Sequence, residues 1–187
     1  MQAAAELFGA LSAMPCRGCL IGGMAVQRWG QPRFTQDVDL TILAPFGSEE
    51  PVIDALLQRF SARGPGAKQH ALDHRVLLLV ASNGVGIDVS LAALPFEEEV
   101  LARASQWTRV EEVWLETCSA EDLVIYKLVA ARPQDLVDVT GVLQRQGGQL
   151  DVERIRSWGC IFAELKEDPD LLTPFEDALR AVRDERR

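Results

Sequence analysis

The sequence lacks three features that would assign its class at once: a long apolar run, a cysteine framework and an excess of basic residues. No window approaches the roughly 18 uninterrupted apolar residues of a membrane span, so we expect no transmembrane helix. Residues 1–14 have neither a basic start nor a long apolar run, which argues against a secretory signal. We therefore expect a cytoplasmic protein with no membrane partner.

Cysteine is scarce, with four residues in a chain of 187. That number does not make a disulfide scaffold, and a cytoplasmic compartment would keep the thiols reduced. Cys16 and Cys19 form a C-x-x-C, but a zinc site needs two more ligands and the other two cysteines stand alone. His70 and His74 have a suitable i, i+4 spacing, again without a third ligand. We expect Cys16 and Cys19 to flank a buried strand, and a redox or structural use of the pair stays open.

Basic residues are outnumbered, with 19 Lys and Arg against 28 Asp and Glu and a net charge of -9. Non-specific binding of nucleic acid depends on clustered basic side chains, so a general phosphate-binding surface is not expected. A nucleic-acid partner could still bind locally, because net charge does not tell where charges converge. A limited basic rim could be formed by Arg28, Arg33, Arg132 and residues 63–68.

The hydrophobic patterns change character near residue 117. Before it, strand signals alternate with helical spacing, and Asn83-Gly84 is a strong hairpin signal between residues 75–82 and 85–92. After it, residues 119–131, 134–146, 151–165 and 170–184 all have helical spacing. We predict an α+β fold with a small mixed β-sheet and flanking helices, followed by a C-terminal helical bundle. The expected domains are a catalytic core, 1–117, and a helical region packed on it, 118–187.

Two aspartates stand one residue apart at the start of the apolar run DVDLTIL, residues 37–43. On a strand, Asp37 and Asp39 project to one face while their apolar neighbours turn into the core. Adjacent carboxylates repel each other, and Mg²⁺ with its preference for oxygen ligands would offset that repulsion. Asp88 lies between apolar residues in GIDVSL, and if that strand pairs beside 37–43, three carboxylates converge. Such a triad suits two Mg²⁺ ions in phosphoryl or nucleotidyl transfer.

A glycine pair, Gly22-Gly23, precedes this strand and is followed by a brief predicted helix. Glycines let the backbone approach phosphate oxygens, and a helix N-terminus offers N–H groups to an anion. The loop QPRFT leads from that helix to the aspartates, and we include its Arg33 and Thr35 among the candidate nucleotide-binding residues.

These motifs stand in a familiar order. The stretch IGGMAVQRWGQPRFTQDVDL, followed by GIDV, resembles the signature of the DNA polymerase β-like nucleotidyltransferase superfamily. The stretch AEDLVIYKLVAARPQDLVDVTGVL resembles the helical segment of its abortive-infection and toxin-type, AbiEii-like branch. The resemblance covers about residues 19–143, and its one departure is a rather long gap between Gly23 and Asp37, which bears on acceptor access.

The resemblance implies a nucleotidyltransferase fold and an activity. The expected reaction is Mg²⁺-dependent transfer of a nucleoside monophosphate from an NTP to a hydroxyl acceptor, which is a tRNA, a protein or a small molecule. A toxin of a toxin–antitoxin pair, with a cognate antitoxin as partner, is also implied. By the same resemblance Gly22 and Gly23 hold phosphates, Asp37, Asp39 and Asp88 hold the metals, and Lys127, Asp135 and Asp138 help to build the nucleotide site.

Plainer interpretations stand beside these roles. Asp88 would be an exposed acid on an edge strand, Lys127 a lysine covering apolar surface, and Asp135 an acid stabilising a helix start. The alternative function is a non-catalytic nucleotide-binding regulatory or antitoxin-type module with the same fold. The presence of all three acids and Lys127 favours the enzyme. A metal-dependent phosphohydrolase fits less well, because it would not need the glycine pair and its metal sites usually include histidine.

Overall fold

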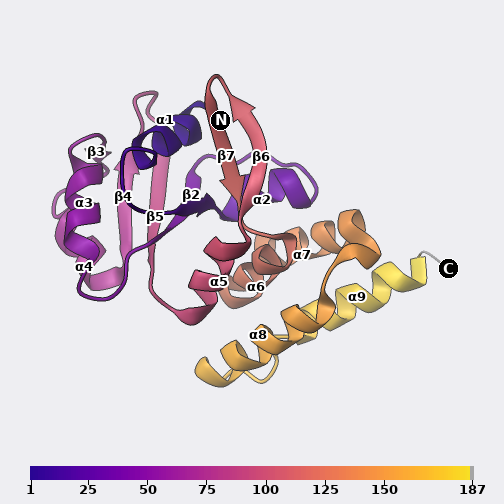
Figure 1. Ribbon diagram of the computed structural model, residues 1–187. Helices are drawn as coiled ribbons and strands as arrows, with labels where there is room; N and C mark the ends of the chain where they lie inside the picture. Colours follow the sequence, from indigo (N-terminus) through magenta and orange to yellow (C-terminus); the bar gives the residue numbers. More distant parts are fainter. Residues whose placement is uncertain (186–187) are drawn as a thin grey trace. The chain divides into compact units, whose positions relative to one another are not determined.

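The computed structural model describes residues 1–185, and the chain divides into two compact units (Figure 1). Unit 1 contains residues 1–24 and 34–118, and unit 2 contains residues 25–33 together with the chain from residue 119 onward. Helix α2 (Gly22–Trp29) therefore has its first three residues in unit 1 and the rest in unit 2. The division into functional domains 1–117 and 118–187 stays a prediction. The sequence did not indicate that residues 25–33 belong to the same unit as the chain from residue 119 onward.

A seven-stranded mixed sheet forms the centre of unit 1, in the order β3-β4-β5-β2-β1-β7-β6. Strand β2 runs parallel to β5, and β1 runs parallel to β7, while the other neighbours are antiparallel. The predicted mixed sheet with flanking helices is thereby confirmed. The strands are β1 (Gly18–Leu20), β2 (Val38–Leu43), β3 (Ser61–Ala62), β4 (Val76–Val80), β5 (Gly86–Ala92), β6 (Ser105–Val110) and β7 (Val113–Thr117).

Alternation of apolar and polar residues sets the two faces of the central strands. In β5 the side chains of Ile87, Val89 and Leu91 are buried in the core, whereas Asp88 and Ser90 turn to the other face. The core is completed by apolar residues of helices that pack on the sheet, which are α1 (Gln2–Leu11), α3 (Glu49–Leu57) and α4 (Ala67–His74). A further helix, α5 (Pro95–Arg103), follows β5.

The β4–β5 hairpin turns where the sequence predicts it. Gly84 has φ +81°, a conformation that glycine adopts without a Cβ clash, and the Asn83 Oδ1 atom accepts a hydrogen bond from Val85 N at 3.2 Å. Because this turn fixes the β4–β5 register, it also fixes the position of Asp88 along the sheet.

Other elements of unit 1 differ from the expected ones. The helical spacing of residues 49–62 predicts one helix, but α3 ends at Leu57 and the chain then forms the short strand β3. The stretch RVEEVWL, residues 109–115, predicts one strand, but it contains the turn of the β6–β7 hairpin. Glu111 in that hairpin turn has a positive φ of 53°. Such turns usually contain Asn or Gly, so the sequence Glu111-Glu112 does not indicate a turn. Helix α4 has little apolar periodicity and was not predicted from the sequence.

Four α-helices and a short 3₁₀ turn make up most of the described part of unit 2: α6 (Ala120–Ala130), α7 (Pro133–Gln146), η1 (Gly147–Gln149), α8 (Val152–Leu165) and α9 (Thr173–Glu185). The predicted C-terminal helices are therefore present. Ser119 caps α6, because its Oγ atom accepts a hydrogen bond from Asp122 N at 3.1 Å. No helix within residues 1–185 is both long and apolar enough to cross a bilayer.

Residues 25–33 are tied to α7 by close backbone approach and by hydrogen bonds. A Cβ atom at Gly30 would lie 3.1 Å from Val142 Cγ2. Arg145 Nη1 donates to the Gly30 carbonyl at 2.8 Å, and Gln146 Nε2 donates to the Trp29 carbonyl at 2.7 Å. These contacts fix the loop that leads to Arg33.

Candidate active site

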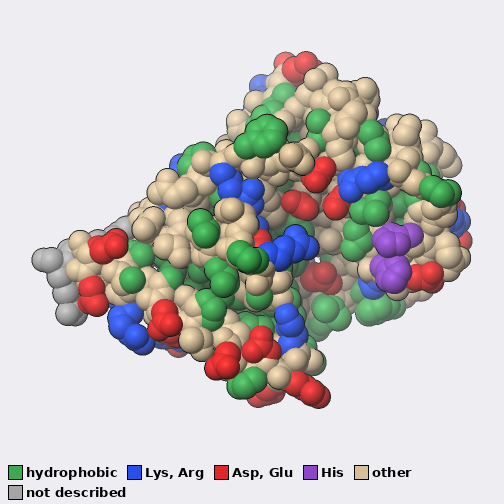
Figure 2. Space-filling view, turned by 180° about the vertical axis from the view of Figure 1, so that it is seen from behind, with side chains coloured by type: hydrophobic (Ala, Val, Ile, Leu, Met, Phe, Trp, Pro, Cys, Tyr) green, Lys and Arg blue, Asp and Glu red, His purple; other side chains and the backbone are tan. Residues whose placement is uncertain are grey.

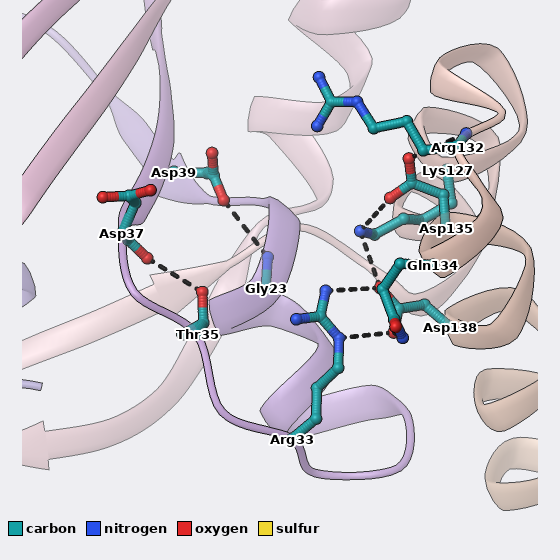
Figure 3. A network of polar contacts seen from close by, with 10 residues as sticks. All are labelled: Gly23, Arg33, Thr35, Asp37, Asp39, Lys127, Arg132, Gln134, Asp135 and Asp138. Atoms are coloured by element: carbon teal, nitrogen blue, oxygen red, sulfur yellow. Dashed lines mark hydrogen bonds and ion pairs between the residues drawn. The ribbon is translucent and has the colours of Figure 1, made fainter.

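The candidate residues fall into two groups, one in each unit, and Figure 3 draws members of both. In unit 1 the carboxylate cluster consists of Asp37, Asp39 and Asp88, with Gly22, Gly23 and Thr35 beside it. In unit 2 the lysine network consists of Arg33, Lys127, Asp135 and Asp138. Each group is described by itself.

Two members of the carboxylate cluster lie directly beside each other. In the parallel β2–β5 pair, Asp39 is in register with Asp88, and neighbouring strands lie about 4.8 Å apart. Their flanking residues Leu40 and Val89 are buried, so both carboxylates project from the opposite face of the sheet. The strand pairing on which the sequence argument depended is thus present.

Asp37 reaches the cluster in a different way from the one expected. Strand β2 begins at Val38, so Asp37 stands in the bend before it, where its carbonyl accepts a hydrogen bond from Thr35 Oγ1 at 3.2 Å. Its Oδ1 atom lies where a Cβ atom on Gly86 would project. The missing side chain at Gly86 therefore leaves room for this carboxylate next to β5.

The glycine pair forms the first turn of α2 and lies against Asp39. Gly22 has φ +55°, and a Cβ atom there would lie 2.6 Å from Asp39 Cγ. Gly23 N donates to Asp39 Oδ2 at 3.4 Å (Figure 3), and a Cβ atom at Gly23 would lie 2.9 Å from Thr35 Cβ. The two glycines thus bring a helix N-terminus against the carboxylate, whereas phosphate binding stays a prediction.

One basic side chain enters the carboxylate cluster. Arg63 follows β3, and its Nη2 atom donates to Asp88 Oδ1 and, at 3.4 Å, to the Leu79 carbonyl. Both partners of the ion pair are about one third exposed, at 35% for Arg63 and 33% for Asp88.

The donor chemistry of the cluster suits Mg²⁺, because all three side chains offer carboxylate oxygens and Gly22 leaves the Asp39 carboxylate unobstructed by a Cβ. Within residues 1–185, however, no group of three or more His, Cys, Asp and Glu is arranged to hold a metal ion. In the present arrangement Asp88 is engaged by Arg63. Metal binding by all three carboxylates therefore requires a rearrangement at Asp88.

The lysine network is a buried set of alternating charges (Figure 3). Lys127 Nζ contacts Asp135 Oδ1 at 2.6 Å and Asp138 Oδ2 at 2.9 Å. Arg33 binds Asp138 through two parallel contacts, Nε to Oδ1 at 2.8 Å and Nη2 to Oδ2 at 2.9 Å. At most 8% of the side chain of each of the three α6 and α7 residues is exposed. Lys127 is therefore an ion-paired internal residue and not a lysine covering apolar surface.

The local sequence explains why these side chains meet. Ala131 takes a left-handed conformation, φ 52°, that ends α6, and Pro133 then begins α7. Asp135 and Asp138 are three residues apart on α7 and share one helix face. Asp135 also accepts a hydrogen bond from Arg132 N at 3.3 Å, so it caps α7 as well as binding Lys127.

Electrostatics keep Asp138 ionised. Burial by itself would raise the pKa of its carboxyl, but hydrogen bonds from Arg33 and Lys127 outweigh burial and hold that pKa below its ordinary value. Asp138 also forms part of the wall of a cavity of about 330 Å³ in unit 2, together with Arg33, Gln134 and Val137.

The chain matches the family model described as nucleotidyl transferase AbiEii toxin, type IV TA system, over residues 7–186. The chain belongs to this AbiEii family. The prediction of a nucleotidyltransferase of the AbiEii-like branch is thereby confirmed, and the match extends beyond the residues 19–143 that carry the motifs. No curated protein matches this family member.

Two solved structures share the fold of this AbiEii family member. The antibiotic-resistance factor ANT(2'')-Ia, determined in solution, is 12% identical with a TM-score of 0.59, and the alignment covers 89% of this chain and 94% of that one. An antigenic nucleotidyltransferase-like protein from Paracoccidioides brasiliensis is 16% identical with a TM-score of 0.54, covering 96% and 91%. At such low identity the likeness shows a nucleotidyltransferase fold.

The cysteine and histidine pairs lie outside both groups. His70 and His74 lie side by side on α4, with ring centroids 4.6 Å apart and ring planes tilted by 47°, and appear as the purple pair on the surface in Figure 2. Cys19 is buried in β1 and Cys16 is partly buried, and within residues 1–185 none of the four cysteines forms a disulfide. Burial raises the pKa of the Cys16 thiol, so it stays protonated near neutral pH.

Arg63 is the residue that the sequence argument assigned least well, because it counted only as part of a basic rim. The two-residue strand β3 gave no periodic signal, so the reach of Arg63 across β4 was not foreseeable. The only available indication was a basic residue directly before Gly64-Pro65-Gly66, where the helical spacing of residues 49–62 stops.

Proposed function

We propose that this AbiEii family member transfers a nucleoside monophosphate from an NTP to a hydroxyl acceptor, with Mg²⁺ as cofactor and pyrophosphate as the leaving group. The observation that carries the proposal is the in-register pairing of Asp39 with Asp88 on parallel strands, with the start of α2 packed against Asp39. If Asp39 were only a solvated acid at the end of a strand, its carboxylate would not need the close approach of Gly22.

In this mechanism Asp37, Asp39 and Asp88 would hold the metal, expected as two ions. Bound Mg²⁺ would neutralise the charge of the triphosphate and of the departing pyrophosphate. Asp88 accepts the proton of the acceptor hydroxyl, whose oxygen attacks the α-phosphorus. The bond between that phosphorus and the oxygen that links it to the β-phosphorus breaks. The electron pair of this bond leaves with pyrophosphate, and the proton stays on the carboxylate.

Nucleotide binding is assigned to residues from both groups. Backbone N–H groups at Gly22 and Gly23, together with Thr35, are proposed to contact phosphate oxygens. In unit 2, the residues proposed to bind nucleotide are Arg33, Lys127, Asp135 and Asp138. For Arg33 and Asp138 the assignment is supported by the cavity that they help to line, because its volume of about 330 Å³ suits a small-ligand group.

The family description leads us to propose a cytoplasmic toxin with a cognate antitoxin. A tRNA end and a protein side chain are the acceptors that this role favours. A small-molecule acceptor is kept because one protein of the same fold is an antibiotic-resistance factor.

The test is transfer of radioactive label from each α-labelled NTP in the presence of Mg²⁺, with total tRNA, cell-extract protein and an aminoglycoside mixture as separate acceptors. Asp39→Asn should lower label transfer by more than about a hundredfold, since even partners of metal ligands matter by about 10–100-fold. Asp73→Asn is the matched control, because Asp73 is an acid of unit 1 bonded to Gln69 on α4. Unchanged label transfer in Asp39→Asn would contradict the mechanism. Nucleotide binding by the wild-type chain without transfer to any acceptor would favour the non-catalytic regulatory module.

A further inference from the structure

Arg63 is anchored at the edge of the sheet and reaches inward across one strand. Its backbone N donates to the Leu78 carbonyl at 3.0 Å, which extends the β3–β4 pairing by one residue. From there the side chain crosses β4, where Nη2 donates to the Leu79 carbonyl at 3.4 Å, and ends on Asp88 of β5. The guanidinium is thus held in place by strand geometry and not by a flexible surface loop.

The same guanidinium also lies next to Asp37. A Cβ atom on Gly86 would lie 2.6 Å from Arg63 Nη2 and would also collide with Asp37 Oδ1, so both groups occupy the space above Gly86. One cation thus pairs with Asp88 and lies near Asp37, and Asp39 is the in-register neighbour of Asp88 on the adjoining strand. This cation stands where positive charge is needed to offset their repulsion.

We propose that Arg63 is an internal counter-cation of the metal-free enzyme and that it competes with Mg²⁺ for Asp88. This inference rests on the proposed function, because it concerns the same three carboxylates. Arg63 is a positioning residue: it keeps the cluster together without metal and releases Asp88 when metal binds.

The exposure of the pair makes such an exchange feasible. A pair that is one third exposed on both sides is weakened by water and salt, so a divalent cation with oxygen ligands can replace the guanidinium. Removing the guanidinium should therefore strengthen metal binding and weaken the metal-free fold. A purely structural salt bridge would produce the second effect without the first.

Metal affinity is the first readout, measured with the full chain and Mn²⁺ by the electron paramagnetic resonance signal of the free ion. Arg63→Gln should bind Mn²⁺ about three- to tenfold more tightly than wild type, since it removes both a competitor and a nearby positive charge. Arg59→Gln is the matched control, because it loses the same charge from an exposed position four residues earlier. Its affinity should stay close to that of wild type.

Thermal stability is the second readout. In EDTA, Arg63→Gln should melt below wild type, and excess Mg²⁺ should narrow that gap. In an Asp88→Asn background the Arg63→Gln change should have little effect on melting, because its partner is already neutral. Arg63→Lys, which keeps the charge without the planar fork, should bind Mn²⁺ with intermediate affinity and serves if Arg63→Gln does not fold.

The outcomes separate this inference from the function beneath it. Equal Mn²⁺ affinity in Arg63→Gln and Arg59→Gln would show that Arg63 does not compete with the metal. If Asp39→Asn lost Mn²⁺ binding in the same experiment, the proposed metal site would still be supported. Absence of Mn²⁺ binding by the wild-type chain would overturn both proposals.

Discussion

At the scale of single residues, Gly22 shows how tightly the carboxylate cluster is built. Its left-handed backbone and the short distance from a Cβ atom to Asp39 leave no room for a side chain. Gly22→Ala should therefore destabilise the fold by about 1–3 kcal/mol and lower transfer activity, because Asp39 must move. Urea unfolding measures the first effect, with Gly64→Ala as control, since a Cβ atom there would meet nothing within 4 Å. Equal midpoints for the two variants would contradict this account.

Asp138 gives a prediction about acid stability. Because its folded pKa is depressed, the unfolded chain binds the proton more readily, and stability rises with pH in that window. The contribution is complete above the unfolded value of about 3.9 and is lost as the pH falls through the lower folded pKa. Asp138→Asn should cost about 3 kcal/mol at pH 7, since Arg33 and Lys127 lose a buried partner.

The measurement is chemical unfolding at pH 7, 5, 4 and 3, with the exposed Asp170→Asn as control. The gap between wild type and Asp138→Asn should shrink as the pH falls below about 4, while the control follows wild type. A gap that stays constant with pH would show that Asp138 contributes by packing and not by charge.

At the scale of secondary-structure elements, α8 carries two ion pairs that differ in burial. Arg154 binds Asp122, which is fully buried in α6, with Nε and Nη2 at 2.9 and 2.8 Å from one oxygen. Arg156 binds Glu176 of α9 at a more exposed position. Arg154→Met should cost about 3–5 kcal/mol, because it leaves a buried carboxylate without its cation.

Arg156→Met makes the same substitution two residues further along α8 and should cause a much smaller loss, because water screens the exposed pair. Thermal melting of both variants at one pH measures the difference. Losses of the same size would mean that the burial of Asp122 does not decide the strength of these helix contacts.

Elements also show what the sequence could and could not reveal. Alternation in β5 and the Asn83-Gly84 turn are local signals, and together they predicted the strand that brings Asp88 beside Asp39. Likewise, the helical spacing of residues 134–146 predicted the helix that carries Asp135 and Asp138. The ion pair of Arg63 joins residues 25 positions apart, and no local pattern indicates it, the β6–β7 turn or helix α4.

At the scale of the whole molecule, the net charge of -9 limits how nucleic acid can bind. Affinity for DNA of random sequence comes mainly from counterion release by clustered basic residues, so it should be weaker than about 10⁻⁴ M at physiological salt. A gel-shift titration with a random duplex at 150 mM salt should show no complex. A shift at micromolar protein would show a basic surface that the overall charge conceals, with Arg33→Gln and Arg132→Gln as variants to locate it.

The grouping of residues 25–33 with the C-terminal helices determines when, during synthesis of the chain, the lysine network can form. Arg33 and Asp138 are separated by 105 positions, and a ribosome adding about 5–20 residues per second needs roughly 5–20 s to bridge them. Strands β2 and β5 of the carboxylate cluster are both synthesised within that interval, whereas the lysine network cannot form until Asp138 has been added. Assembly of the buried charges therefore lags behind synthesis of the carboxylate cluster, which gives a chain of this architecture a built-in delay between making its candidate metal ligands and joining Arg33 to Asp138.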